Sequence, residues 1–143
     1  AIDMASWFLP PSKVIVREDF GPARDEKVYR SKGYDIFSDN LKFVILVDKG
    51  SASASEILAG ALAEHGKAIL VGDKTFGKGS VQELVNITTE TSLKITIARW
   101  LTPNGLSISE SGIEPEYVVK YTPADREAGR DPQLEKAVEI LKQ

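Results

Sequence analysis

Two apolar runs with a helical pattern between them organise the first half of the chain. Residues 43–47 and 68–71 are apolar at every position, which predicts strands buried on both faces of a largely parallel sheet. Four residues between the runs recur at the spacing of one helix face: Ile57, Leu58, Ala61 and Leu62. Gly66 follows where that helix would end. Residues 43–71 therefore predict a strand–helix–strand unit.

Short strands and one more helix account for the rest of the pattern. The strands are expected at 14–16, 28–30, 80–87, 93–100 and 117–119. We expect 28–30 to pair back on the first strand, and a polar turn at 88–91 to join the two longer strands. Asp131 and Pro132 predict the start of a last helix. Its core-facing residues would be Leu134, Ala137, Val138 and Leu141. The pattern predicts an α/β fold with a mixed β-sheet and flanking helices.

Composition narrows the class of protein without identifying it. With 143 residues, 42% of them hydrophobic and 27% charged, the chain is expected to form one globular domain. The net charge is −3 and no basic cluster stands out, which argues against a nucleic-acid partner. The lack of cysteine excludes disulfides, thiolate metal sites and cysteine nucleophiles.

The opening residues indicate that the chain continues upstream. Residues 1–9 have the pattern of the last turns of an amphipathic helix that Pro10 and Pro11 stop, with no cap and no initiator methionine before them. We therefore expect a piece of a longer protein, with any targeting segment lying upstream. No apolar run reaches the roughly 18 to 20 residues of a membrane span.

A serine-rich turn leads from the first buried strand into the helix. Residues 50–56, G-S-A-S-A-S-E, are small enough for a sharp turn that brings a side chain close to a substrate. The free N–H groups of a helix start also suit a developing oxyanion. However, Ser53 and Glu56 have the spacing of a capping box, so these serines could simply begin the helix. Local chemistry alone favours capping over catalysis.

The single histidine does not supply a base for this serine. His65 lies at the other end of the same predicted helix, roughly 15 Å or more from Ser53 by helix rise alone. A Ser-His-Asp triad within this chain is therefore not expected. We expect His65 near the surface at the helix C-terminus.

A glycine-rich loop follows the second buried strand. Residues 72–80, G-D-K-T-F-G-K-G-S, nearly match the phosphate-binding loop, which needs Ser or Thr where Gly79 stands. That loop also requires a following helix, whereas residues 81–87 have the pattern of a strand. The loop therefore nearly matches the motif, but a nucleotide-binding site is not expected here.

Lys78 is the alternative candidate base. A solvated lysine stays protonated at neutral pH, but burial in an apolar pocket lowers the pKa of a lysine and makes it a proton acceptor. If 78–82 is extended, Lys78, Ser80 and Gln82 share one face, and Gln82 could orient the lysine nitrogen. Most lysines in glycine loops are simply solvated, and the residues alone do not decide between these readings.

A family resemblance bears on whether Ser53 and Lys78 are catalytic. Residues 50–57, followed by A-G-A-L at 59–62, resemble the nucleophile segment of the carboxy-terminal processing peptidases, the tail-specific serine proteases. Residues 72–79 with Val81 and Gln82 are similar to the lysine segment of that family. Three further matches are F-L-P at 8–10, L-T-P-N-G at 101–105 and G-I-E-P at 112–115. The similarity covers nearly the whole chain, with the motifs in the family's order.

The resemblance implies a role for each site residue. Ser53 would be the nucleophile, Lys78 the general base 25 residues later, and Gln82 its orienting partner. The backbone N–H of Ala54 would be one oxyanion donor, while Ser51 and Ser55 would be structural. The implied reaction is peptide-bond hydrolysis through an acyl-enzyme, near the C-terminus of protein substrates. The family uses no metal or organic cofactor, is typically extracytoplasmic, and has a fold similar to the crotonase and Clp protease core.

The resemblance also implies parts that these residues do not contain. Residues 1–143 would be the C-terminal portion of a serine peptidase catalytic domain, without the family's PDZ domain and without an upstream strand that supplies the second oxyanion donor. We therefore expect an active parent enzyme and little activity from the chain alone. The alternative is a non-catalytic binding or scaffold domain that retains the motifs. Whether the protein forms a homo-oligomer is left open.

Overall fold

The computed structural model describes residues 1–22, 24–37, 40–109 and 111–143. Its elements, in chain order, are α1 (Ile2–Ala5), β1 (Val14–Asp19), β2 (Lys27–Arg30), β3 (Val44–Val47), α2 (Ala54–Glu64), β4 (Ile69–Gly72), β5 (Ser80–Asn86), β6 (Ser92–Leu101), β7 (Tyr117–Val118), α3 (Pro123–Glu127) and α4 (Pro132–Leu141). None of the helices in these ranges is long and apolar enough to cross a membrane.

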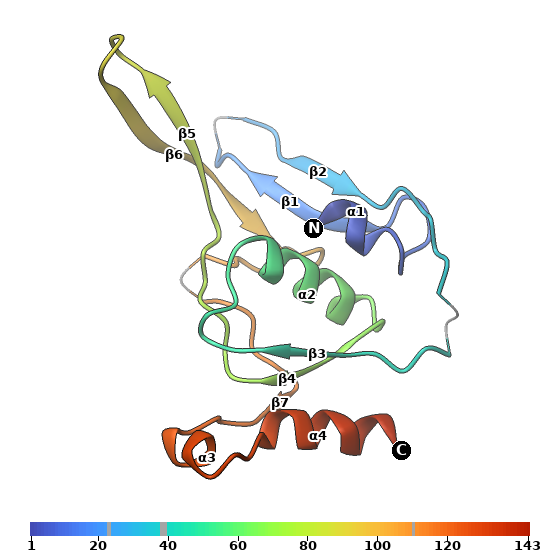
Figure 1. Cartoon of the computed structure of the whole chain (residues 1–143). Coiled ribbons are helices and arrows are strands. Elements are labelled where there is room, and N and C mark those ends of the chain that lie inside the picture. The colour runs from blue at the N-terminus through green and yellow to red at the C-terminus, as the bar shows by residue number, and fades with distance from the viewer. Residues whose placement is uncertain (23, 38–39, 110) are drawn as a thin grey trace.

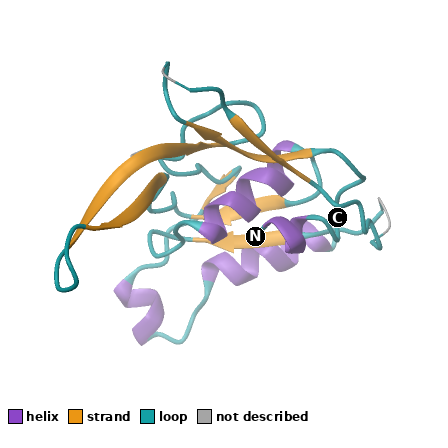
Figure 2. Cartoon of the chain, turned by 90° about the horizontal axis from the view of Figure 1, so that it is seen from above, coloured by secondary structure: helices purple, strands orange, loops and turns teal. Residues whose placement is uncertain are grey.

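Helix α2 lies between two small sheets, and α4 covers the outer face of one of them (Figure 1). One sheet has the order β2-β1-β6-β5 and the other the order β3-β4-β7. Seen from above, α2 crosses the middle of the molecule while the β5–β6 hairpin extends to one side (Figure 2). The expected mixed α/β architecture is confirmed, although its strands form two sheets rather than one.

The predicted strand–helix–strand unit is present as β3-α2-β4. Its two strands are parallel, with Val44 opposite Ile69 and Val47 opposite Gly72. Gly66 has a φ of 67°, the left-handed conformation that ends many helices, and Lys67 N–H donates to Leu62 O at 2.8 Å. The core on the α1 and β1 side of α2 consists of Ala5, Leu9, Ile15, Val16, Ile57, Ala61, Leu62, Ala68 and Ile108. This packing fixes both ends of α2 relative to the strands.

The hairpins are also confirmed. β2 pairs antiparallel with β1, and β5 pairs antiparallel with β6 around the polar turn at 88–91. The turn after β6 closes at Gly105, which has a φ of 86° and donates its N–H to Thr102 O at 2.9 Å.

Two expectations about burial were wrong, and one short helix was missed. β3 is not buried on both faces, because only Val47 is buried and Leu46 is 42% exposed. In α4 the buried residues are Ala137 and Ile140, whereas the other predicted core residues, Leu134, Val138 and Leu141, are exposed. The short helix α3 was not predicted, although Thr122, Pro123 and Asp125 provide its cap and first turn.

Candidate active site

Ser53 lies at the sharp turn that joins β3 to α2. Its backbone has φ 56° and ψ −114°, a conformation that costs a residue other than glycine about 1–3 kcal/mol. The turn before it is fixed by Asp48, whose Oδ1 accepts hydrogen bonds from the N–H groups of Gly50 and Ser51. Hydrogen bonds of the turn to Asp48 and Glu56 maintain this strained conformation and hold the exposed Ser53 at the N-terminus of α2, where Ala54 is the first helical residue. The N–H of Ala54 therefore has no acceptor within the helix.

Glu56 connects the serine turn to the glycine-rich loop. Its side chain is fully buried, and its carboxylate accepts four hydrogen bonds. Oε2 accepts from the N–H groups of Ser53 at 2.8 Å and Lys78 at 2.9 Å. Oε1 accepts from Thr75 Oγ1 and from Gly77 N–H, each at 2.6 Å. A buried carboxylate without these donors would be very costly, so Glu56 holds the two loops in one arrangement.

The far side of the glycine-rich loop is held by the segment before β7. Thr75 Oγ1 accepts from Ile113 N–H at 2.7 Å, and Thr75 N–H donates to Ile113 O at 3.1 Å. Gly79 is packed so closely that a Cβ there would lie 2.3 Å from the backbone nitrogen of Ser109. Lys78 is therefore flanked by two fixed residues, one bonded to Glu56 and one pressed against Ser109.

The structure brings the backbones of Ser53 and Lys78 together but leaves both side chains exposed. Among the described residues, no hydrogen bond joins Ser53 Oγ to Lys78 Nζ. A second contact ties the loops, because Phe76 N–H donates to Ser51 O at 2.9 Å. The arrangement places a serine, a lysine and a helix N-terminus on one exposed edge.

The period-two argument relates Gln82 to Ser80 but does not extend to Lys78. β5 begins at Ser80, so Lys78 lies before the strand. The register shift between Val81 and Gln82 puts the extra residue, Ile97, in β6 and leaves the alternation of β5 intact. Gln82 is exposed, and its proposed role rests on the family resemblance.

His65 and the near-match to a phosphate loop play no part in this geometry. His65 is half-buried at the C-terminal end of α2, where its Nε2 lies 2.7 Å from Val14 O of β1. It is therefore held at the opposite end of α2 from Ser53. Strand β5 follows Gly79, so the loop lacks the helix start that binds phosphate in nucleotide sites.

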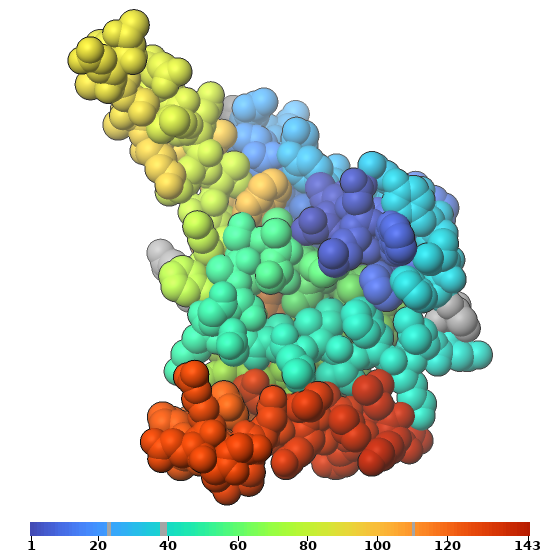
Figure 3. All heavy atoms as spheres, in the orientation of Figure 1, coloured from blue at the N-terminus to red at the C-terminus, as the bar shows by residue number. Residues whose placement is uncertain are grey.

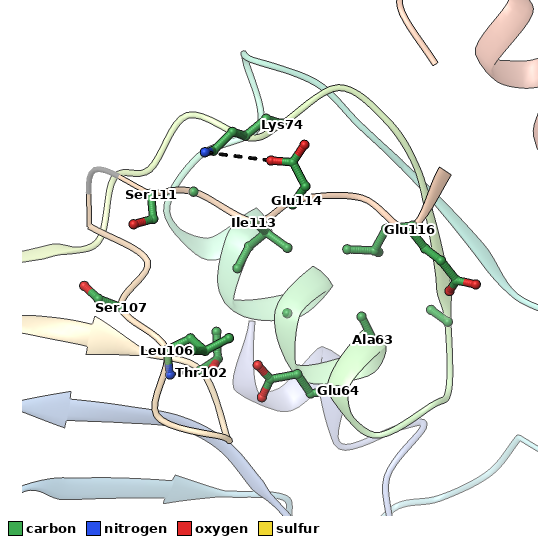
Figure 4. A pocket seen from close by; sticks show the side chains of 14 residues that line it. Ala63, Glu64, Lys74, Thr102, Leu106, Ser107, Ser111, Ile113, Glu114 and Glu116 are labelled. Atoms are coloured by element: carbon green, nitrogen blue, oxygen red, sulfur yellow. Dashed lines mark hydrogen bonds and ion pairs between the residues drawn. The ribbon is translucent and has the colours of Figure 1, made fainter. Parts of the chain in front are cut away.

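A cavity of about 580 Å³ lies beside α2, between that helix and residues 102–116 (Figure 4). Gly60, Ala63 and Ile113 contribute to its apolar lining, and Lys74 and Glu114 form an ion pair of 3.8 Å beside it. None of the predicted site residues lines this cavity.

Glu56 is the site residue whose importance sequence reasoning missed. Its position three residues after Ser53 suggested only a helix cap. The cap contact is present, since Ser53 N–H donates to Glu56, yet the same carboxylate reaches the loop 19 to 22 residues further on. The sequence does contain a signal for this role. Glu56 follows the small residues 50–55 and directly precedes Ile57 on the apolar helix face, which is a position where an acid would be buried.

Solved structures with the same architecture define the class of fold. The chain superposes on the photosystem II D1 C-terminal processing protease with a TM-score of 0.73 and 30% identity, over 82% of this chain and 30% of that one. It also matches the tricorn protease with a TM-score of 0.62 over 87% of this chain and 12% of that one, where 19% identity shows the fold alone. The fold is that of an α/β peptidase core.

The family model described as "Peptidase family S41" matches residues 1–119. The chain therefore belongs to peptidase family S41, and the resemblance to carboxy-terminal processing peptidases is confirmed. Carboxy-terminal processing protease CtpB of Bacillus subtilis is 54% identical over 76 residues, which are 53% of this chain and 16% of that protein. The carboxyl-terminal-processing protease of Synechocystis is 34% identical over 143 residues, covering 98% of this chain and 33% of that protein.

The chain is much shorter than these relatives. It spans 16% of the Bacillus protein and 33% of the Synechocystis protein. A relative from Arabidopsis thaliana, carboxyl-terminal-processing peptidase 2, is described as chloroplastic.

Proposed function

We propose that Ser53 and Lys78 are the nucleophile and the general base of a serine peptidase that cleaves proteins near their C-terminus. The observation that carries the proposal is the buried Glu56 carboxylate, which accepts hydrogen bonds from both residues' N–H groups and so sets their relative position. The strained Ser53 turn at a helix start is a second support, because Ser53 directly precedes Ala54, whose N–H has no acceptor within the helix.

In this mechanism Ser53 Oγ attacks the scissile carbonyl carbon while its proton passes to Lys78 Nζ. The Ala54 N–H donates to the oxyanion, and Gln82 orients the lysine. The C–N bond then breaks, the leaving amine takes the proton, and water hydrolyses the Ser53 ester by the reverse proton path. Lysine serves as a base when it is removed from water, whereas Lys78 is exposed in this chain. The remaining parts of the protein, or the bound substrate, would have to cover it.

The location and partners belong to the same proposal. The relatives of this chain are processing proteases of bacteria and chloroplasts. We therefore propose that the protein acts in an extracytoplasmic or lumenal compartment, and that its substrates are protein C-termini. A PDZ domain outside these residues would capture the substrate, as the family resemblance implies. The alternative, a scaffold domain that does not cleave, is favoured by the exposure of Lys78 and the missing Ser53–Lys78 side-chain bond.

Matched variants of the complete protein separate these functions. Ser53→Ala should abolish labelling by a small fluorophosphonate and cleavage of a protein with an apolar C-terminus, whereas Ser55→Ala in the same turn should retain both. Lys78→Ala should abolish cleavage, whereas Lys74→Ala in the same loop should retain it. Undiminished cleavage by Ser53→Ala or Lys78→Ala would refute the proposal, and a wild-type protein that neither labels nor cleaves would support the scaffold.

A further inference from the structure

The free edge of β5 begins directly beside the candidate lysine. β5 is the last strand of its sheet in the described part of the chain, and it starts at Ser80, two residues after Lys78. The hairpin that it forms with β6 projects away from the body of the molecule (Figure 3). An edge strand offers unpaired N–H and C=O groups along its length, which an extended backbone can pair with.

The hairpin closure identifies which backbone groups face that edge. Ile87 N–H donates to Thr91 O at 2.9 Å, so this pair bonds across the hairpin. Bonded and non-bonded pairs alternate along an antiparallel ladder, and the register is regular from Asn86 back to Gln82. The N–H and C=O groups of Gln82, Leu84 and Asn86 therefore point away from β6, toward the free edge.

One face of the hairpin is exposed and, apart from Glu83, apolar. Val85 lies opposite Leu93, and Glu83 lies opposite Ile95, so these four side chains share a face. Val85, Leu93 and Ile95 are 36%, 51% and 40% exposed. A strand added beside β5 would place every second side chain over this face, next to Val85.

We propose that the edge of β5 is the docking strand for the extended peptide substrate, with apolar side chains at every second position facing Val85. The inference rests on the proposed function, since continuity with Lys78 is what selects a peptide substrate as the occupant. A strand paired along Gln82, Leu84 and Asn86 leads back along the chain toward Lys78 and Ser53. The edge of β5 would thus bind the peptide through its backbone hydrogen-bonding groups, and the apolar face would select the side chain at every second position.

A peptide N-methylation series tests the pairing without altering the protein fold. The probe is a fluorescein-labelled decapeptide of alternating leucine and serine, bound to the Ser53→Ala protein and followed by fluorescence anisotropy. N-methylation at every second residue should weaken binding roughly threefold to tenfold, while N-methylation at the intervening residues should change it little. Equal effects at all positions, or no binding, would overturn the proposal.

A proline variant tests the same edge from the protein side. Leu84→Pro removes an N–H that faces the edge and leaves the β5–β6 ladder intact. We expect it to lower peptide affinity roughly threefold to tenfold relative to Leu84→Ala, with fluorophosphonate labelling of Ser53 retained in both otherwise wild-type variants. Equal affinities would overturn the proposal, as would a dimer of the wild-type protein that Leu84→Pro dissociates, because a second copy would then occupy the edge.

The two inferences can fail separately. If wild-type protein is neither labelled by the fluorophosphonate nor able to cleave, the proposed peptidase function fails, but the alternating N-methylation pattern still supports the docking strand. If labelling succeeds and the pattern is absent, the docking strand fails while the peptidase stands.

Discussion

Ser53 and Lys78 donate their backbone N–H groups to the same oxygen atom, Oε2 of Glu56, over 2.8 and 2.9 Å. The relation explains how residues 25 positions apart in the sequence are held at one edge without a direct bond between their side chains. It also makes the buried carboxylate, rather than either candidate catalytic residue, the structural centre of the site.

Replacing Glu56 with glutamine should damage both folding and reactivity. The amide keeps one acceptor oxygen, so two of the four donors lose their partner, at about 1–3 kcal/mol each. We expect the free energy of unfolding, measured with urea, to fall by about 2–6 kcal/mol. Labelling of Ser53 should fall with it. Glu64→Gln is the matched control, because Glu64 is less buried and is bonded to Asn104 N–H. A Glu56→Gln protein as stable as this control would contradict the role of Glu56.

The strain at Ser53 should be measurable as stability. Glycine adopts the observed φ and ψ without the steric cost that serine or alanine meets. We therefore expect the free energy of unfolding of Ser53→Gly to be about 1–3 kcal/mol higher than that of Ser53→Ala. Neither variant should be labelled by a fluorophosphonate. Urea denaturation of the two variants makes the comparison. Equal stabilities would mean that the turn relaxes in solution.

Two buried threonines distinguish a site effect from a general loss of stability. Thr75→Val removes the hydroxyl that donates to Glu56 and accepts from Ile113 N–H, and Thr102→Val removes one that accepts from Leu106 N–H. Thr75→Val should lower the free energy of unfolding by about 1–3 kcal/mol because Glu56 and Ile113 lose a partner. Thr102→Val should lower it less, because Leu106 is exposed and water can replace the lost hydroxyl. Only Thr75→Val should also slow labelling of Ser53 at a temperature where both variants are folded. Equal labelling rates would show that Thr75 does not position the site.

Strong acidification should loosen α3. The hydrogen bond from the Thr122 side chain, with that of Arg130, holds the pKa of Asp125 below its usual value. A lowered pKa in the folded state means that the ionised carboxylate stabilises the fold. That contribution is complete above the unfolded pKa of about 3.9 and is lost as the pH falls through the folded value. NMR titration should show the Asp125 carboxyl titrating below pH 3.9 together with the α3 amide shifts. In Asp125→Asn this step should be missing from the α3 amides, and a wild-type midpoint at or above 3.9 would contradict the prediction.

The main elements were predictable because their patterns are local. The apolar runs and the helical spacing of Ile57, Ala61 and Leu62 led directly to β3, α2 and β4. Which side of α4 is buried was not predictable in the same way. Leu134, Val138 and Leu141 form a stripe as apolar as the buried Ala137 and Ile140. Helix periodicity does not distinguish these neighbouring stripes, and packing of α4 against β3 and β4 determines which one is buried.

The site was only partly readable from sequence. Ser53 and Lys78 could be singled out by family resemblance, but local chemistry gave each an ordinary alternative. The central contact depends on Glu56 being buried against residues 75–78, and such burial comes from the tertiary fold rather than from spacing. The start of β5 at Ser80 likewise follows from its pairing with β6, and no period-two pattern shows that Lys78 lies before the strand.

Two glutamates of helix α2, one near each end, bond the helix to neighbouring loops. Near its start Glu56 accepts from the glycine-rich loop, and in its last turn Glu64 accepts from Asn104 N–H at 2.8 Å. A slide of α2 along its axis by a single residue, about 1.5 Å, would stretch the contacts at both ends at once. The position of Ser53 at the start of α2 therefore depends on contacts along the whole length of the helix, and a change at the distant 102–105 turn can shift this proposed nucleophile.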